Sequence, residues 1–134
     1  MDDENSLLIP KAADPENLDK HYVWVNEFND LSYKDFYTRF MSLERDPSVV
    51  VIPIMISSYG GSVDVLSAMR DLIKSSRKPV ATIASGKAMS CGASLLAAGT
   101  KGYRYASLST RIMIHEISTG SWQVKATDFQ NDAA

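Results

Sequence analysis

Apolar and polar residues follow one another along the chain in blocks that predict strands and helices in alternation. Residues 22–25 are rich in β-forming side chains and predict a first strand. Between Asn29-Asp30 and Asp46-Pro47, which are typical start and stop signals, apolar residues recur at helical spacing. The apolar run from Val49 to Ser57 predicts a buried second strand. The predicted apolar positions of the intervening helix are Leu31, Phe36, Phe40 and Leu43, with Tyr33 and Tyr37 beside them.

A glycine turn and a second helix follow this strand. Gly60-Gly61 predicts the turn, and Ser62 is a typical cap for the start of a helix. Asp64 places a negative charge in the first turn, where the helix dipole favours it. The helix has one apolar face, made of Val65, Leu66, Met69, Leu72 and Ile73.

The blocks that follow are shorter. Residues 79–84 predict a third strand, and residues 90–98 predict a small-residue helix that Gly99 can terminate. Residues 102–105 and 111–115 predict two more strands. This alternation of strand and helix predicts an α/β fold.

The two ends of the chain show weaker patterns. Residues 1–20 are polar, contain Pro10 and Pro15 and have no periodic pattern, so we expect a flexible arm. One folded domain is expected over residues 21–134, and residues 124–130 predict the start of a further helix.

Composition narrows the classes of function. With 14 Lys and Arg against 16 Asp and Glu, and no long basic run, nucleic acid and anionic membranes are not expected partners. Cys91 is the only cysteine, so no internal disulfide forms and a zinc site is not expected. Every apolar run is far shorter than the ~20 residues of a membrane helix. Because residues 1–6 are acidic, unlike a secretory signal, we expect a cytoplasmic protein.

Ser90 and His115 carry the strongest chemical signal. Ser90 lies among small residues at a predicted helix start, and His115 ends an apolar strand on the same face as Met113. A serine needs a base to become a nucleophile, so this pair predicts acyl transfer. The simpler alternatives are that Ser90 is a helix cap and His115 a structural residue. His21, the second histidine, lies at the border of the arm and is expected to be exposed.

The glycine pair has three interpretations. A turn without side chains allows a backbone N–H to approach a ligand, as in half of an oxyanion hole. It is also compatible with a plain strand-to-helix turn or with a loop that binds phosphate at a helix N-terminus.

Four runs in register carry a resemblance to a known family. They are residues 56–63, which contain Gly60-Gly61, residues 86–93, which contain Ser90, and the runs 95–104 and 113–115. In order and spacing they resemble the proteolytic subunit of the Clp protease, over about residues 21–128. The resemblance implies an α/β fold of repeated β-β-α units, related to the crotonase fold. Its C-terminal handle helix and final elements are missing from these 134 residues.

The resemblance also implies roles for individual positions. Ser90 matches the family's nucleophile and His115 its general base. Gly61 and Cys91 match the two backbone N–H donors of the oxyanion hole. Val63 and Ser118 match positions that pair with an extended substrate backbone, a β-augmentation mode of peptide binding.

The sequence departs from the family pattern around these positions. Ser57 and Tyr59 stand where asparagine and proline are usual, and Met89 and Cys91 flank the serine in place of alanine and methionine. Glu116 stands where glutamine is common, but strand neighbours point to opposite faces, so we do not expect it to orient His115.

No residue matches the third member of the family's triad, an aspartate that follows the handle helix. Asp128 and Asp132 are the acidic residues near the end of the chain, and neither occupies that position. We therefore expect this chain alone to be weakly active or inactive.

Family members form stacked seven-membered rings that a ring ATPase of the AAA+ unfoldase type supplies with unfolded polypeptide. ATP is therefore a ligand of the partner, and no cofactor is implied for this chain. One alternative is a catalytically silent ring subunit or assembly partner. Another is a crotonase-type site that binds an acyl-coenzyme A, which Ser90 and His115 argue against. Lys87, three residues before Ser90, suggests a Ser/Lys pair but is expected to be an exposed lysine.

Overall fold

The computed structural model describes residues 21–114. The expectations for the arm at 1–20, for His115 and Ser118, and for a helix near 124–130 lie outside the described residues. The elements, in chain order, are β1 Val23–Val25, α1 Asp30–Arg45, β2 Ile52–Ser58, α2 Val63–Ser75, β3 Val80–Met89, α3 Cys91–Ala97, β4 Arg104–Ala106 and β5 Arg111–Met113.

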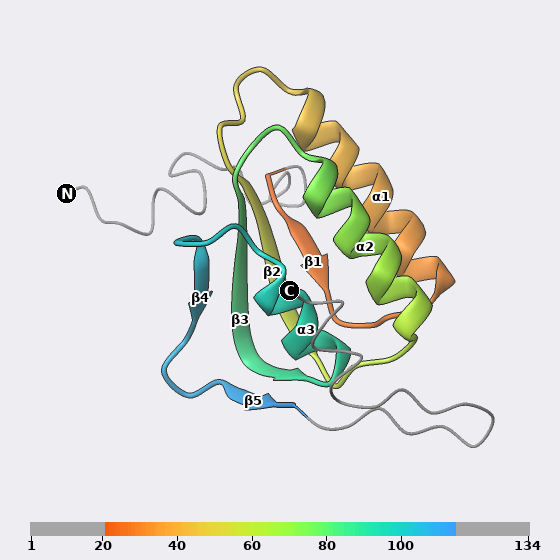
Figure 1. Cartoon of the computed structure of the whole chain (residues 1–134), viewed down its shortest axis with the longest axis vertical. Helices are drawn as coiled ribbons and strands as arrows, with labels where there is room; N and C mark the ends of the chain where they lie inside the picture. Colours follow the sequence, from red (N-terminus) through yellow and green to blue (C-terminus); the bar gives the residue numbers. More distant parts are fainter. Residues whose placement is uncertain (1–20, 115–134) are drawn as a thin grey trace.

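The described strands form one parallel sheet in the order β1-β2-β3-β4, with β5 also paired to β3 (Figure 1). Parallel neighbours require crossover connections, and α1 and α2 supply the first two. The predicted α/β class is therefore confirmed, with each helix between two strands of one sheet.

The start of α1 is fixed by its cap. The Asn29 side chain accepts a hydrogen bond from the Ser32 N–H at 2.8 Å, and the Ser32 hydroxyl accepts one from the Asn29 N–H at 3.0 Å. This reciprocal pair satisfies N–H groups that a helix start otherwise leaves without partners. Phe36, Phe40 and Leu43 are buried as predicted. The prediction for Leu31 is wrong, because this side chain lies in the first turn and is 80% exposed.

One face of the sheet packs against the helices. Alternate residues of β2, Ile52, Ile54 and Ile56, are fully buried, as the two-residue period of a strand requires. In Figure 1, α1 and α2 lie side by side along this core. The described core also contains Phe36, Phe40, Leu66, Met69, Val80 and Leu95.

The opposite face carries an apolar row that crosses four strands. Trp24 pairs with Met55, Met55 with Ile83, and Ile83 with Tyr105. Trp24 is 47% exposed and Tyr105 is 41% exposed.

β3 is longer than the sequence pattern predicts. The pattern ends the strand at Ala84 and places a turn at Gly86, whereas β3 continues through Gly86 to Met89. Gly86 has φ +83°, and the register with β2 shifts there. β3 first pairs with β4 and then, beyond the bend, with β5 (Figure 1). Because β5 pairs with the second half of β3, the strand continues past Gly86, which interrupts the apolar pattern of the sequence.

Candidate active site

Ser90 lies at the sharp turn between β3 and α3. Its backbone has φ 55° and ψ −116°, and it is the one described residue other than glycine with positive φ. Such a conformation costs on the order of 1–3 kcal/mol and persists only where the surroundings impose it. Ser90 occupies the cap position of α3, but its side chain makes no capping hydrogen bond. The simple explanation of Ser90 as a helix cap therefore does not account for its hydroxyl.

The end of β5 lies against this turn. The Ser90 N–H donates a hydrogen bond to the Met113 carbonyl at 2.8 Å, and Met89 pairs with Met113 in the sheet. His115 is two residues further along the chain, outside the described residues. The described part of β5 thus connects the turn of Ser90 to the segment that carries the predicted base.

The glycine turn lies on the other side of Ser90. A Cβ atom added at Gly60 would lie 3.0 Å from the Ser90 Cβ and 3.4 Å from the Cys91 nitrogen. Gly60 has φ +116° and Gly61 has φ +154°. A side chain at 60 would therefore crowd the serine, which explains glycine at this position.

Ser58 fixes the glycine turn and was not singled out from the sequence. Its fully buried hydroxyl accepts a hydrogen bond from the Gly60 N–H at 3.0 Å. A serine two residues before a glycine pair is a signal for such a turn. A Cβ at Gly92 would lie 3.1 Å from the Ser58 carbonyl oxygen, so α3 packs closely on the end of β2.

Cys91 is buried between the two turns. Its thiol donates a hydrogen bond to the Gly61 carbonyl, with Sγ and O 3.4 Å apart. Burial raises the pKa of the thiol above its ordinary value, since the interior disfavours the thiolate. Cys91 therefore stays a neutral thiol at physiological pH and is not an activated nucleophile.

Comparison with known families matches residues 17–134 of this chain to the Clp protease family. The chain is 41% identical, over 107 residues, to the ATP-dependent Clp protease proteolytic subunit 2 of Prochlorococcus marinus (strain MIT 9312). That alignment covers 80% of this chain and 53% of the relative. The chain belongs to the Clp protease family. The resemblance drawn from its motifs is confirmed.

Two further relatives are also named as proteolytic subunits of the ATP-dependent Clp protease. The chain is 36% identical over 130 residues to proteolytic subunit 1 of the ATP-dependent Clp protease of Thermobifida fusca (strain YX), covering 95% of this chain and 59% of the relative. It is 39% identical over 108 residues to proteolytic subunit 3 of Synechococcus sp. (strain CC9605), covering 81% and 54% respectively. The chain thus spans about half the length of the curated Clp protease relatives that it matches.

The structure brings together three of the residues predicted from the Clp protease motifs, namely Gly61, Ser90 and Cys91. Val63 is the first residue of α2. Its carbonyl points along the helix, so its N–H is the backbone group suited to pairing with a peptide. The expectations for His115 and Ser118 lie outside the described residues.

Lys87 is directed to a neighbour other than Ser90. Its Nζ lies 4.7 Å from the centre of the Tyr59 ring and 3.5 Å from the Ser57 hydroxyl. An ammonium group above an aromatic face is attracted by the ring. These contacts favour the prediction that Lys87 is not the base of a Ser/Lys pair. The expectation that Lys87 is exposed is wrong, because the side chain is half-buried against Tyr59 and Ser57.

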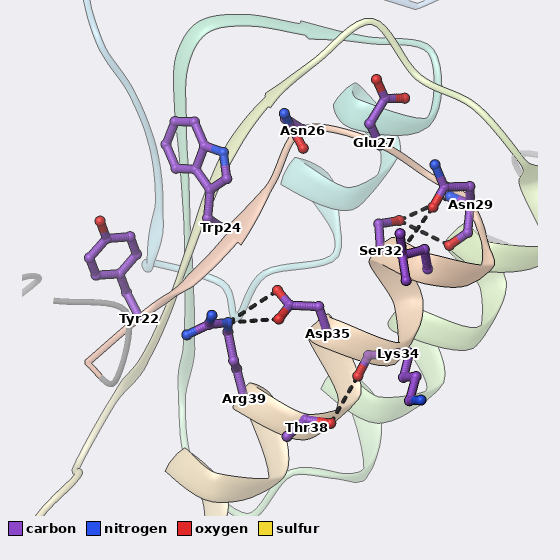
Figure 2. Close-up of a pocket in the computed structure, with 11 residues that line it drawn as sticks. Tyr22, Trp24, Asn26, Glu27, Asn29, Ser32, Lys34, Asp35, Thr38 and Arg39 are labelled. Carbon is purple, nitrogen blue, oxygen red and sulfur yellow. Dashed lines mark hydrogen bonds and ion pairs between the residues drawn. The ribbon is translucent and has the colours of Figure 1, made fainter. Parts of the chain in front are cut away.

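A separate groove of about 740 Å³ runs between β1 and α1 (Figure 2), and Ser90 is not among the residues that line it. Trp24 and Tyr22 line one wall, and the ion pair of Asp35 with Arg39, 3.0 Å long, lines the other. The groove contains no predicted site residue and no histidine, cysteine or strained serine. We place the candidate site at Ser90, because nucleophile geometry identifies a catalytic centre more directly than the volume of an open groove.

The described residues provide neither a candidate metal site nor a candidate membrane-spanning helix. In the range 21–114, no group of three or more His, Cys, Asp and Glu side chains lies close enough to hold a metal ion. Within that same range, no helix has the length and apolar character needed to cross a bilayer.

Proposed function

We propose that this protein is a serine endopeptidase subunit of the Clp type, which hydrolyses peptide bonds through an acyl-enzyme on Ser90. The observation that carries the proposal is the strained backbone of Ser90, which directs a serine without a capping bond toward the glycine turn. A nucleophilic serine on a tight strand-to-helix turn is typical of acyl-transfer enzymes.

In the proposed reaction, the Ser90 oxygen attacks the carbonyl carbon of the peptide bond while His115 removes the serine proton. His115 then protonates the leaving amine, and water, activated by the same base, hydrolyses the acyl-enzyme. The histidine assignment rests on the Clp protease motif and on the hydrogen bond between Ser90 and Met113.

We propose the Gly61 and Cys91 N–H groups as donors to the oxyanion of the tetrahedral intermediate. Among the described residues outside the helices and strands, neither N–H donates a hydrogen bond to a backbone carbonyl. Cys91 begins α3, where N–H groups lack partners within the helix. Losing one such donor in an acyl-transfer enzyme costs about 3–4 kcal/mol of transition-state stabilisation.

The proposed substrate is an unfolded polypeptide in extended conformation. The Val63 N–H at the start of α2 and the backbone of Ser118 would pair with it, and backbone pairing accepts many sequences. The relatives are named as subunits of an ATP-dependent protease. We therefore propose ring assembly in the cytoplasm, with an AAA+ ATPase partner that consumes the ATP.

The test is covalent labelling with a fluorophosphonate probe, followed by peptide mapping. We expect modification at Ser90, none in Ser90→Ala, and strongly reduced labelling in His115→Ala. Labelling is measured over hours, so that a slow reaction at Ser90 is also detected. Modification elsewhere, or none at Ser90 in the assembled protein, contradicts the proposal.

The alternative of a silent ring subunit predicts a different result. Mixed rings with a catalytic partner would then hydrolyse peptides at a rate that Ser90→Ala does not change. Native mass spectrometry establishes that the mixed rings have formed, and hydrolysis of a fluorogenic peptide measures their activity.

A further inference from the structure

Cys91 contributes two separate groups to the candidate site. Its backbone N–H is one proposed oxyanion donor, and its thiol donates to the carbonyl of Gly61, whose N–H is the other. The side chain is 2% exposed, so water does not compete for this hydrogen bond. One residue therefore connects the two halves of the proposed oxyanion hole.

Gly61 needs such a connection, because it has no side chain to hold its peptide groups in place. Its neighbours are held on both sides: the Gly60 N–H by the Ser58 hydroxyl at 3.0 Å, and the Ser62 N–H by the Phe28 carbonyl at 2.8 Å. The Gly61 carbonyl between them is held by the Cys91 thiol. These contacts restrict rotation about the backbone bonds of Gly61, which set the direction of its N–H.

A purely space-filling role is the simpler explanation for a small buried thiol. Two facts argue against it as the whole explanation. The sulfur and oxygen atoms lie at hydrogen-bonding distance, 3.4 Å. The raised pKa of the thiol also keeps its hydrogen in place over the neutral range, so the donor is always present.

We propose that Cys91 is a positioning residue, whose thiol hydrogen bond to the Gly61 carbonyl holds the two oxyanion N–H groups in a fixed relative orientation. The proposal rests on the proposed function, since it concerns the geometry of the same oxyanion hole. Cysteine can make this contact because its thiol carries a hydrogen to donate, which a thioether such as that of methionine lacks.

The first experiment measures the hydrogen bond without any activity. The chain contains one cysteine, so its infrared spectrum has a single S–H stretching band. We expect this band at the lowered frequency of a hydrogen-bonded thiol, with a shift to the free-thiol frequency on unfolding in urea. A band at the free-thiol frequency in the folded protein overturns the proposal.

The second experiment measures the rate at which a fluorophosphonate modifies Ser90, since the phosphoryl oxygen occupies the oxyanion site. We expect Cys91→Ala to slow labelling about 5- to 10-fold, the worth of one ordinary hydrogen bond. Cys91→Ser, which restores a donor, should recover most of this loss. Ala93→Gly is the control for mere destabilisation, because it weakens the same helix without contacting Gly61.

The outcomes separate this inference from the proposed function. Equal labelling of wild type, Cys91→Ala and Cys91→Ser overturns the inference and leaves the proposed function intact. A loss of labelling that tracks melting temperature in Cys91→Ala and Ala93→Gly alike also overturns the inference. Absence of labelling at Ser90 in the wild type overturns the proposed function, and the inference with it.

Discussion

The Ser90 N–H and the Met113 carbonyl oxygen lie 2.8 Å apart and form a hydrogen bond across the junction of β3 and β5. The described residues of β5 are all exposed, so this strand is held by backbone pairing more than by burial. Loss of β5 should therefore disturb the geometry at Ser90 strongly and lower the stability of the core only slightly.

Met113→Pro tests this dependence. Proline lacks the N–H of a paired strand residue and fixes φ, so β5 should detach from β3 near Ser90. We expect labelling of Ser90 to slow by about 100-fold, the effect of a misplaced reactive group, with only a small fall in melting temperature. Met113→Ala is the control, because it keeps the N–H and removes a side chain that is half exposed. A large fall in melting temperature in Met113→Pro would contradict the expectation that β5 affects the geometry at Ser90 more than the stability of the core.

Ser90→Gly should make the protein more stable and inactive. Glycine adopts positive φ without the steric cost that serine bears, so we expect a gain of about 1 kcal/mol in the free energy of unfolding. Ser90→Ala removes the same hydroxyl and keeps the strain, so it should show no comparable gain. Urea unfolding of the three proteins measures the difference, and equal stabilities would show that the turn is not strained.

Gly61→Ala should strongly destabilise the protein. A Cβ at this position would lie 2.6 Å from the Phe28 carbonyl oxygen, a backbone atom that also accepts a hydrogen bond from the Ser62 N–H and so cannot move aside freely. We expect a loss of about 2–4 kcal/mol, the range of overpacking added to backbone strain. Gly102→Ala is the matched control: it also has positive φ, +90°, but nothing lies within 4 Å of its added Cβ. Similar losses in both variants would show that backbone conformation, and not the contact with Phe28, determines the cost.

Alkaline pH should destabilise the protein through Cys91. Burial raises the pKa of this thiol above its ordinary value of 9.0, so above that pH the unfolded chain loses a proton that the folded protein retains. Stability is unaffected below pH 9 and falls as the pH rises toward the folded pKa, by at most about 1.4 kcal/mol per pH unit. Urea unfolding at pH 8 and pH 10 should show a larger loss in wild type than in Cys91→Ser. Equal losses would exclude the thiol as the cause.

Local sequence signals are sufficient to predict α1 and α2. Asn29 and Ser62 precede their first turns, and both side chains make the expected capping hydrogen bonds. The prediction for Leu31 is wrong because apolar spacing alone does not show where a helix face meets the core. Its side chain lines the groove between β1 and α1 and is 80% exposed.

The extent of β3 depends on partners that are distant in the sequence. Gly86 and Lys87 interrupt the apolar pattern, and only the pairing of Lys87 with Arg111 and Met89 with Met113 continues the strand. A pattern read over neighbouring residues has no access to such a pairing.

The motifs predict which residues gather at the site, but not how they are held. The proximity of Gly61, Ser90 and Cys91 follows from the matched runs. The backbone strain at Ser90, the buried hydroxyl of Ser58 and the thiol hydrogen bond arise from contacts between separate elements. These three features cannot be predicted from residues that are neighbours in the sequence.

The positive φ of Ser90 also has a consequence for how this sequence has evolved. A substitution that relieves strain at no functional cost is not removed by selection, so it remains open to any lineage. Codon 90 would then drift to glycine in any lineage where nothing depends on the hydroxyl. To keep a serine at φ 55° in a lineage would therefore require selection for its hydroxyl.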